Sequence, residues 1–381
     1  MKKLLAIILS VIIIGLTGCT RKKVMDFETL RFLGAFGGIG VDLTIISSEE
    51  RIKNEMEGVY EDINQMLVDF DNVFSINHTE SQVETVIQKV NRLSGVEPVE
   101  VPEEVILVIE KAFEVSEKSL DENGVAQYDI TIEPLWKEWK FIEYMGSYDI
   151  APIPTQERLN ELIPLVDYKK IVIDKEASTV YLEEVGMGLD LGSIAKGYAA
   201  DKIREYLLSK NFTRALINVG GNLITMGSSY LFKEEKDIPW EIMITTPYTT
   251  AGMGNSYYIG HFNDTDRTIV TSGVYERYFT IGDKEYHHIL DPGTGYPRES
   301  DLLSLTIITD NSMTADAFST TIFSLGLVEG LKLVEQTDNM EAVAITREKE
   351  VWVTSGMEGN FVFNEKASDL RYKYMGVKKW N

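Results

Sequence analysis

Apolar residues recur along the chain with two periods, and their order predicts the secondary structure. Spacings of three and four residues over 49–70 and 102–119 indicate amphipathic helices, and further helices are expected at 194–210 and 314–335. A first strand is expected at 41–46, in the alternating segment VDLTII. Further short strands follow residue 168, with the sequences KKIVID, STVYLEE, ALINV, WEIMITT, YYIGHF, TIVTSG, LSLTIIT, EAVAIT and EVWVT.

This order of elements distinguishes between fold classes. Strands that adjoin strands, with helices inserted between them, predict an α+β fold with mixed or antiparallel sheets. A doubly wound parallel sheet would need a regular alternation of strands and helices. Prolines at 152, 154 and 164 bracket a short helix with Thr155 as its N-cap, and they mark a candidate subdivision of the chain near 150–165.

The N-terminus has the form of a bacterial lipoprotein signal. Lys2 and Lys3 precede a nearly unbroken apolar run over residues 4–16, which is too short to span a bilayer. The run ends in Leu-Thr-Gly-Cys, which resembles the lipobox at which such signals are cleaved and the cysteine is lipidated. The alternative is an uncleaved anchor with an incidental cysteine.

The lipoprotein interpretation predicts how the chain is divided and where it is found. We expect residues 1–18 to be the signal peptide, Cys19 to carry the lipid, residues 19–31 to form a linker and residues 32–375 to form the folded domain. The folded domain would then lie on the extracytoplasmic face of the bacterial cell membrane, held there by its N-terminal lipid.

Composition narrows the classes of function. Of the 381 residues, 44% are hydrophobic and 25% are charged, which is near the globular average and excludes a disordered chain or a multi-span membrane protein. The net charge of -23, from 60 acidic against 37 basic residues, repels phosphate backbones, so nucleic acid is not expected as a partner. One cysteine excludes an intramolecular disulfide, and with only four histidines a structural zinc site is not expected.

Two glycine-rich segments are candidates for binding an anion. In residues 187–201, MGLDLGSIAKGYAAD, glycines surround the expected start of a helix, where backbone N–H groups and the positive end of the helix dipole face a ligand. Lys196 would add a point charge for a phosphate, and Asp190 could orient a ligand amide. In residues 215–223, ALINVGGNL, a strand runs into two glycines that permit close approach of a backbone. Taken alone, each segment is equally compatible with a plain turn.

Two later segments carry titratable and metal-ligating residues. In residues 285–297, EYHHILDPGTGYP, adjacent His287 and His288 point to opposite faces of a strand, so at most one of them can face a site as a proton acceptor or hydrogen-bond donor. In residues 311–326, Asp316 and Thr320 share one face of a predicted helix. Their hard oxygen atoms, with backbone carbonyls and phosphate oxygens, suit Mg²⁺ far better than zinc. Structural histidines and ordinary helix capping remain the alternatives.

Together, and in this order, the four segments resemble the ApbE family of FAD:protein FMN transferases. The resemblance is carried by DLGSIAKGYAAD, INVGGNL, SGVYERYF, HHILDPGTGYP and TADAFSTTIFSLG, and it extends to YDITIEPLWKEW and the lipobox. It implies an ApbE-like fold over almost the whole mature chain. Members of this family bind FAD and a divalent ion and move FMN to a threonine hydroxyl of a target protein, with release of AMP. Some members instead hydrolyse FAD to FMN and AMP.

The resemblance also implies roles for individual residues. It implies a Mg²⁺ ion bound by Asp316, Thr320 and the backbone carbonyl of Ser193, and it makes His288 the catalytic residue. The positions that it implies for FAD binding are Asp190, Lys196, Trp139, Lys140, Phe141 and Phe36.

The sequence departs from the family pattern at two positions. Asn77 lies where members often have a tyrosine that packs on the cofactor, and Gly293 replaces a basic residue of the usual DPRTG turn. The expected function is a Mg²⁺-dependent FAD:protein FMN transferase, whose partners are acceptor proteins modified on threonine. The alternatives are an FAD pyrophosphatase, a flavin-binding lipoprotein without chemistry, and an extracytoplasmic solute receptor.

Overall fold

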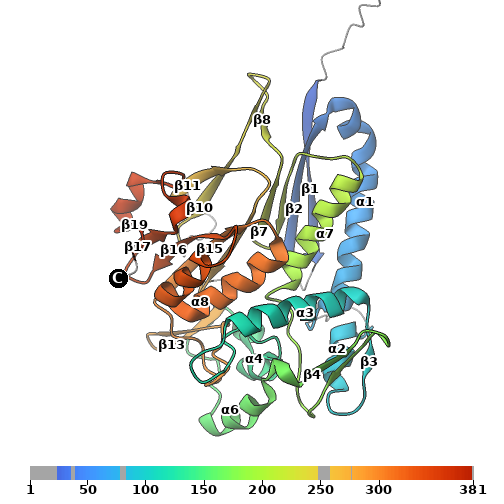
Figure 1. Cartoon of the computed structure of the whole chain (residues 1–381), viewed down its shortest axis with the longest axis vertical. Helices are drawn as coiled ribbons and strands as arrows, with labels where there is room; N and C mark the ends of the chain where they lie inside the picture. Colours follow the sequence, from blue (N-terminus) through green and yellow to red (C-terminus); the bar gives the residue numbers. More distant parts are fainter. Residues whose placement is uncertain (1–23, 36–38, 78–82, 248–257, 276, 380–381) are drawn as a thin grey trace, which may run out of the picture.

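The computed structural model describes residues 24–35, 39–77, 83–247, 258–275 and 277–379 (Figure 1). Its central element is a mixed sheet of nine strands. In spatial order these strands are β1 (Met25–Ala35), β2 (Ile39–Ser48), β6 (Ala215–Val219), β7 (Asn222–Met226), β12 (Thr268–Gly273), β15 (Leu302–Thr309), β16 (Glu341–Thr346), β17 (Glu350–Val353) and β19 (Lys373–Val377). Neighbouring strands are antiparallel up to β17, which pairs in parallel with β19.

Helices and smaller sheets surround this central sheet. The α-helices are α1 (Glu49–Phe74), α2 (Val86–Arg92), α3 (Glu103–Lys118), α4 (Glu133–Trp139), α5 (Phe141–Tyr144), α6 (Gln156–Leu162), α7 (Ala195–Ser209) and α8 (Ser312–Glu335). The smaller sheets consist of β3 (Val99–Glu100) with β5 (Thr179–Leu182) and β4 (Ile171–Asp174), of β8 (Ser229–Leu231) with β9 (Lys236–Ile238), of β10 (Trp240–Thr245) with β11 (Tyr258–Asp264) and β18 (Val362–Phe363), and of β13 (Tyr278–Ile281) with β14 (Lys284–His287).

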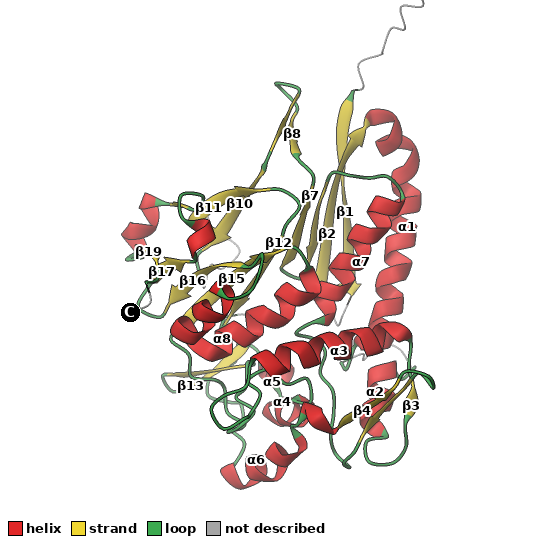
Figure 2. Cartoon of the chain, in the orientation of Figure 1, coloured by secondary structure: helices red, strands yellow, loops and turns green. Residues whose placement is uncertain are grey.

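The central sheet is covered on both faces. β15 is buried along its whole length, and its adjacent residues Ile307 and Ile308 belong to two different core clusters. The cluster of Ile307 includes apolar residues of α1, α3, α7 and α8, whereas the cluster of Ile308 includes those of β10 and β11 (Figure 2). Because successive side chains of a strand point to opposite faces, a strand covered on both sides is buried at every position, as β15 is. The α+β class with mixed sheets, predicted from the sequence, is confirmed.

The prediction of a linker over residues 19–31 is wrong from Met25 onward, because β1 begins there and pairs with β2. β1 is one of the two edge strands of the sheet. Leu30 and Phe32 pack on the core, while Phe27 is half exposed. Only a short stretch of this edge strand is buried, so its sequence shows no long alternation of apolar and polar residues. For this reason the sequence pattern did not predict β1. The subdivision near 150–165 stays a prediction.

α7 and α8 cap each other's N-terminus. α7 has no side-chain cap from the residue that precedes it, and instead Asp316 of α8 accepts a hydrogen bond at Oδ2 from the backbone N–H of Gly197, at 3.0 Å. In the other direction, Asp201 of α7 accepts hydrogen bonds from the backbone N–H groups of Ser312, at 3.0 Å, and Met313, at 2.9 Å. A carboxylate at a helix N-terminus satisfies free N–H groups and opposes the helix dipole. The two helices therefore fix each other's position at this end.

The mutual capping requires the two backbones to lie in contact. A Cβ atom at position 197 would lie 2.2 Å from the carbonyl oxygen of Ser312 and 2.7 Å from the Cα of Met313. Both distances are far below van der Waals contact, so only glycine fits where α7 passes the start of α8.

α8 has the length and apolar composition of a membrane span, and it is the one such helix in the described part of the chain. However, 61% of its most apolar window is buried inside the fold, against the central sheet. A helix that is apolar all round and covered by protein is a core helix.

α8 is interrupted at Gly326, whose φ of 78° and ψ of -177° are not helical. The last carbonyl groups before the break are satisfied from outside the helix, since Arg298 donates from Nε to the carbonyl oxygen of Ser324 at 2.9 Å. After the break, Asp301 accepts a hydrogen bond at Oδ1 from the backbone N–H of Leu327 at 2.9 Å. Both new helix ends are therefore capped.

Substitution of Gly197 tests the contact between the two helices. Gly197→Ala is expected to lower the free energy of unfolding by about 3 kcal/mol, because the added methyl group must push α7 away from α8. Gly58→Ala is the matched control, since it lies within α1 and a Cβ there meets no atom within 4 Å. The control is expected to be neutral or to stabilise by up to about 1 kcal/mol. Denaturant unfolding measures both, and equal effects would contradict the close crossing.

Candidate active site

A cavity of about 250 Å³ lies where the N-terminus of α7, one face of α8 and the ends of the sheet strands meet. All four segments that the sequence pattern singled out contribute to its wall. The polar residues that line it are Ser75, Asn77, Gln127, Tyr128, Asp129, Asp190, Ser193, Lys196, Asn222, Thr271, Ser272, Arg277, His288, Asp316, Thr320 and Ser324.

The loop before α7 is folded around a carboxylate. Asp190 accepts a hydrogen bond at Oδ1 from the backbone N–H of Gly192, at 2.8 Å, and thereby closes the turn. Ser193 is joined to the wall of the cavity because its hydroxyl donates to the hydroxyl of Tyr128, at 3.1 Å. Lys196 reaches back from the first turn of α7 and donates from Nζ to the carbonyl oxygen of Gly192, at 2.7 Å. The loop is thus held by its own side chains and by the hydroxyl of Tyr128.

Asp316 places a carboxylate between the ammonium group of Lys196 and a backbone N–H group on this wall. Its Oδ1 lies 3.1 Å from Nζ of Lys196, and its Oδ2 accepts the hydrogen bond from Gly197 described above. The Asp316 side chain is buried, whereas 22% of the Lys196 side chain is exposed. Thr320 lies one helical turn further along α8 and lines the same cavity.

These oxygen atoms fit a magnesium ion better than a transition metal. Within the described ranges, no group of three or more His, Cys, Asp and Glu side chains could hold a metal. The available donors are the carboxylate of Asp316, the hydroxyl of Thr320 and the carbonyl of Ser193, all on the wall of the cavity. Mg²⁺ typically binds one or two carboxylates and takes its remaining ligands from water and substrate phosphates. The ammonium group of Lys196 already places a positive charge against Asp316 Oδ1.

His288 faces the cavity, and His287 does not. Nδ1 of His288 lies 3.2 Å from the carbonyl oxygen of Arg277. A carbonyl can only accept, so the proton of the neutral ring is on Nδ1 and Nε2 is left as the proton acceptor. His287 is buried on the other side of the strand, where Nε2 lies 3.1 Å from the carbonyl oxygen of Arg298. The sequence-based expectation that the two rings point to opposite faces is confirmed.

Burial and nearby cations keep His288 neutral. Loss of hydration, followed by the charges of Arg277, His287 and Lys196, lowers the pKa of His288 to about 3. Burial has the opposite effect on Asp190, whose pKa it raises, although the bond from Gly192 and the two cations Arg277 and Lys196 act to lower it. Burial thus disfavours the charged forms of both side chains, and Arg277 and Lys196 are the cations of this cavity wall.

The turn at 291–295 is fixed to α8. Asp291 accepts a hydrogen bond at Oδ1 from the N–H of Gly293, at 2.8 Å, and its Oδ2 pairs with Nη1 of Arg298, at 2.6 Å. Arg298 also donates to α8 at Ser324. Gly293 stands where the usual turn has a basic residue, so this turn lacks that side chain. The preceding residue, Pro292, lines the cavity.

Several buried polar atoms of the cavity wall have no partner within the protein. Among the described residues these are Nδ2 of Asn222, Oε1 of Gln127 and Oγ of Ser324. Buried polar groups are nearly always hydrogen-bonded, so unpartnered ones in a cavity indicate a site for a polar ligand. Arg277 and Tyr128, which hold His288 and Ser193, were not singled out from the sequence as site residues. Both lie in segments that carried the family resemblance, which was the available signal.

The segment at 139–141 is placed differently from the expectation. Trp139 and Phe141 are completely buried in a separate core cluster, and Trp139 donates from Nε1 to the carbonyl oxygen of Gly295. Lys140 is an exposed residue in the left-handed region at the end of α4. None of the three lines the cavity, and Trp136, one helical turn earlier, does. Phe36 lies outside the described residues.

The sequence comparisons agree with this geometry. A model described as the ApbE family matches residues 38–344 of the chain. The chain belongs to the ApbE family. A relative from Klebsiella pneumoniae (strain 342), named FAD:protein FMN transferase, is 32% identical over 291 residues, which cover 76% of this chain and 83% of that protein. A relative of the same name from Treponema pallidum (strain Nichols) is 28% identical over 359 residues, which cover 92% and 93%.

Solved structures of ApbE proteins share the fold of this ApbE-family chain. The ApbE protein of Thermotoga maritima aligns with a TM-score of 0.68 and 28% identity, over 91% of this chain and 100% of that chain. The flavin transferase ApbE from Vibrio cholerae aligns with a TM-score of 0.73 over 88% of this chain and 99% of that chain, at 21% identity. The likeness extends over nearly the whole described part of the chain, so the ApbE-like fold predicted from the sequence is confirmed.

The low pKa of His288 predicts a pH dependence of stability. The unfolded chain takes up a proton near pH 6.5, whereas the folded chain does so only near pH 3, so the free energy of unfolding falls as the pH is lowered through this window. His287, with a pKa lowered to about 4 by burial, acts in the same direction. Between pH 7 and 5, His288→Gln should reduce the slope of the free energy of unfolding against pH by up to about 1.4 kcal/mol per pH unit. Chemical denaturation at each pH measures it, with His261→Gln as a control for losing a histidine elsewhere; an unchanged slope in His288→Gln would contradict the buried neutral ring.

Proposed function

We propose that this chain is a Mg²⁺-dependent FAD:protein FMN transferase, which moves FMN from FAD to a threonine hydroxyl of an acceptor protein and releases AMP. The observation that carries the proposal is that Asp316, Thr320, Lys196 and His288 line one cavity. The names of its relatives in the ApbE family support the same activity.

The positive groups of the cavity are suited to the diphosphate of FAD. Lys196 of α7 and Arg277, which precedes β13, both line the cavity. Three carboxylates, Asp129, Asp190 and Asp316, line the same cavity, and Asp316 already pairs with Lys196. The unpartnered atoms of Asn222 and Gln127 can hydrogen-bond the polar parts of the dinucleotide.

Phosphoryl transfer depends on positioning and on charge neutralisation. Asp316, Thr320 and the carbonyl of Ser193 would hold the Mg²⁺ ion, which supplies positive charge at the diphosphate when it is bound. Lys196 can then move from the Asp316 carboxylate to a phosphate oxygen, since its flexible stem is partly exposed.

His288 is suited to accept the proton of the incoming hydroxyl. Its Nε2 carries the free electron pair, and the carbonyl of Arg277 fixes the ring orientation through Nδ1. The threonine oxygen forms a bond to the phosphorus of the FMN half, the bond from that phosphorus to the AMP oxygen breaks, and the threonine proton passes to Nε2. Burial is the main cause of the low pKa of His288, and a bound diphosphate would raise that pKa by offsetting the charges of Arg277 and Lys196.

The test is incubation of the purified chain with FAD, Mg²⁺ and a candidate acceptor protein. Transfer gives an acceptor with covalent flavin fluorescence and the added mass of FMN on a threonine, together with one AMP per label. Free FMN and AMP without label would indicate an FAD pyrophosphatase, in which water replaces the hydroxyl. Binding of FAD without any turnover would indicate a flavin-binding lipoprotein, and it would contradict the proposal.

Substitutions on α8 test the metal ligands. Asp316→Asn keeps an oxygen for the bond from Gly197 but loses the charge, and it is expected to lower the transfer rate on the order of 100-fold at fixed Mg²⁺. Thr320→Val removes a neutral ligand and should cost less, on the order of 10-fold. Asp338→Asn, at an exposed position on another part of the surface, is the control. Rates measured against Mg²⁺ concentration separate weaker metal binding from slower chemistry, and equal losses at 316 and 320 would contradict the ranking.

We also propose that the chain is a lipoprotein on the extracytoplasmic face of the bacterial cell membrane, attached through Cys19. The support is the Leu-Thr-Gly-Cys sequence after a short apolar run, which is typical of such signals. Cys19→Ala should abolish incorporation of labelled palmitate and leave the chain with its uncleaved signal. Metabolic labelling followed by membrane fractionation measures this outcome, and undiminished palmitate incorporation in the variant would contradict the assignment.

A further inference from the structure

Large apolar side chains are exposed in a cluster after α4. The fractions exposed are 51% for Ile142, 58% for Met145, 69% for Tyr148 and 68% for Ile150. Single exposed apolar residues are ordinary on a protein surface, whereas several within a short segment usually mark an interaction site. These four residues are called the apolar rim below.

The backbone of the apolar rim is ordered by pairing with β13. The N–H of Gly146 donates to the carbonyl of Tyr278 at 2.8 Å, the N–H of Thr280 donates to the carbonyl of Ser147 at 3.0 Å, and the N–H of Asp149 donates to the carbonyl of Thr280 at 2.8 Å. The segment thus forms an isolated parallel bridge with β13 at Tyr148, and these hydrogen bonds order its backbone over residues 146–149.

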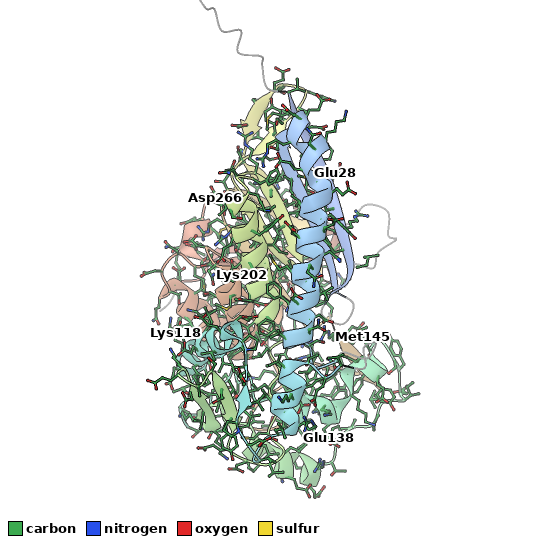
Figure 3. All side chains as sticks on the ribbon, turned by 90° about the vertical axis from the view of Figure 1, so that its right-hand side faces the viewer. Glu28, Lys118, Glu138, Met145, Lys202 and Asp266 are labelled. Carbon is green, nitrogen blue, oxygen red and sulfur yellow. The ribbon has the colours of Figure 1, made fainter. Side chains whose placement is uncertain are left out.

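The apolar rim is directly connected to the wall of the cavity. β13 begins one residue after Arg277, which lines the cavity and whose carbonyl holds His288. Tyr148 pairs with Thr280, which lies three residues after Arg277. Three residues of extended backbone separate Arg277 from Thr280 by about 10 Å. Figure 3 shows Met145 below Glu28, at the right-hand side of the view.

The inner side of the same segment packs on the cavity wall. Phe141 and Ala151, at its two ends, are buried in the core cluster that also contains Trp136 and Leu290. Trp136 and Leu290 line the cavity. The rim therefore forms the outer surface of a wall whose inner surface faces the cavity.

We propose that the apolar rim is the docking surface for the acceptor protein, and that it binds an uncharged apolar segment located three to five residues from the target threonine. This inference rests on the proposed function, since only transfer to a protein brings a polypeptide to this wall. The distance along β13 sets the separation, because an extended peptide covers about 10 Å in three residues. Tyr148 is the expected centre of the contact, since exposed tyrosines supply large rigid area at low entropic cost. FAD and water do not need the rim, so FAD turnover should not depend on it.

The experiment compares two eleven-residue peptides that each contain one threonine, at the centre. The first has leucine and valine three to five residues from the threonine on both sides, and the second has serine at those positions. The unsubstituted chain, with FAD and Mg²⁺, should flavinylate the first peptide with a kcat/KM at least about 10-fold higher than the second. In Tyr148→Ser and in Met145→Ser this preference should disappear, while FAD affinity and slow FAD hydrolysis without peptide remain unchanged.

Met243→Ser is the matched control, because Met243 is 59% exposed on β10 and belongs to the other side of the sheet. It should retain the peptide preference. Since all three positions are exposed, thermal unfolding should show the same midpoint for each variant. A preference that persists in Tyr148→Ser, or equal transfer to the two peptides, would overturn the docking proposal while leaving the proposed function intact. Loss of self-association in Tyr148→Ser with an unchanged preference would assign the rim to a second copy of the chain instead. Absence of transfer to any threonine would contradict the proposed function, and the docking inference with it.

Discussion

The structure depends on two carboxylates, one from α7 and one from α8, each of which caps the N-terminus of the other helix. Asp201 of α7 caps the start of α8, and Asp316 of α8 caps the start of α7. Because both helix ends need a partner for their free N–H groups, neither helix can shift along the other without losing a charged hydrogen bond. The requirement for glycine at position 197 follows from the same contact. This arrangement brings the glycine loop of one helix and the oxygen donors of the other to a single cavity.

The electrostatics of the cavity follow from that crossing. Asp316 is buried and paired with Lys196, so its charge is compensated before any ligand binds. Arg277, contributed by a different part of the chain, adds a second cation and depresses the pKa of His288 together with burial. The cavity therefore combines an acid that is paired with a lysine, a second cation at Arg277 and a neutral histidine.

The sequence contained much of this information, although not uniformly. Residues with strong periodicity were placed well, since α1, α3, α7, α8 and the buried strand β15 lie where the apolar patterns indicate. Asp316, Thr320, Ser193, Lys196 and His288 all line the cavity, because chemistry-bearing residues in short motifs keep their local geometry. Two kinds of feature were missed. β1 is held by backbone pairing at a sheet edge, which leaves little trace in side-chain hydrophobicity.

The second kind of feature that the sequence did not predict is the orientation of aromatic residues within a single helix. Trp136 and Trp139 are three residues apart in α4, yet Trp136 faces the cavity and Trp139 is enclosed by Phe141, Phe279 and Tyr286. Which of two neighbouring tryptophans faces a ligand depends on how the helix is rotated against its surroundings. That rotation is set by distant residues, and no local pattern contains it.

The break in α8 has a consequence for how the oxygen donors respond to a ligand. The part of α8 that carries Asp316 and Thr320 is short, because Gly326 ends it, and it is fastened at one end by Asp201 and at the other by Arg298. A long uninterrupted rod could bend or slide when a charged molecule enters, whereas a short piece held at both ends keeps the spacing of its side chains. The geometry of the donors is then set while the polypeptide folds, and the entering molecule does not have to organise them.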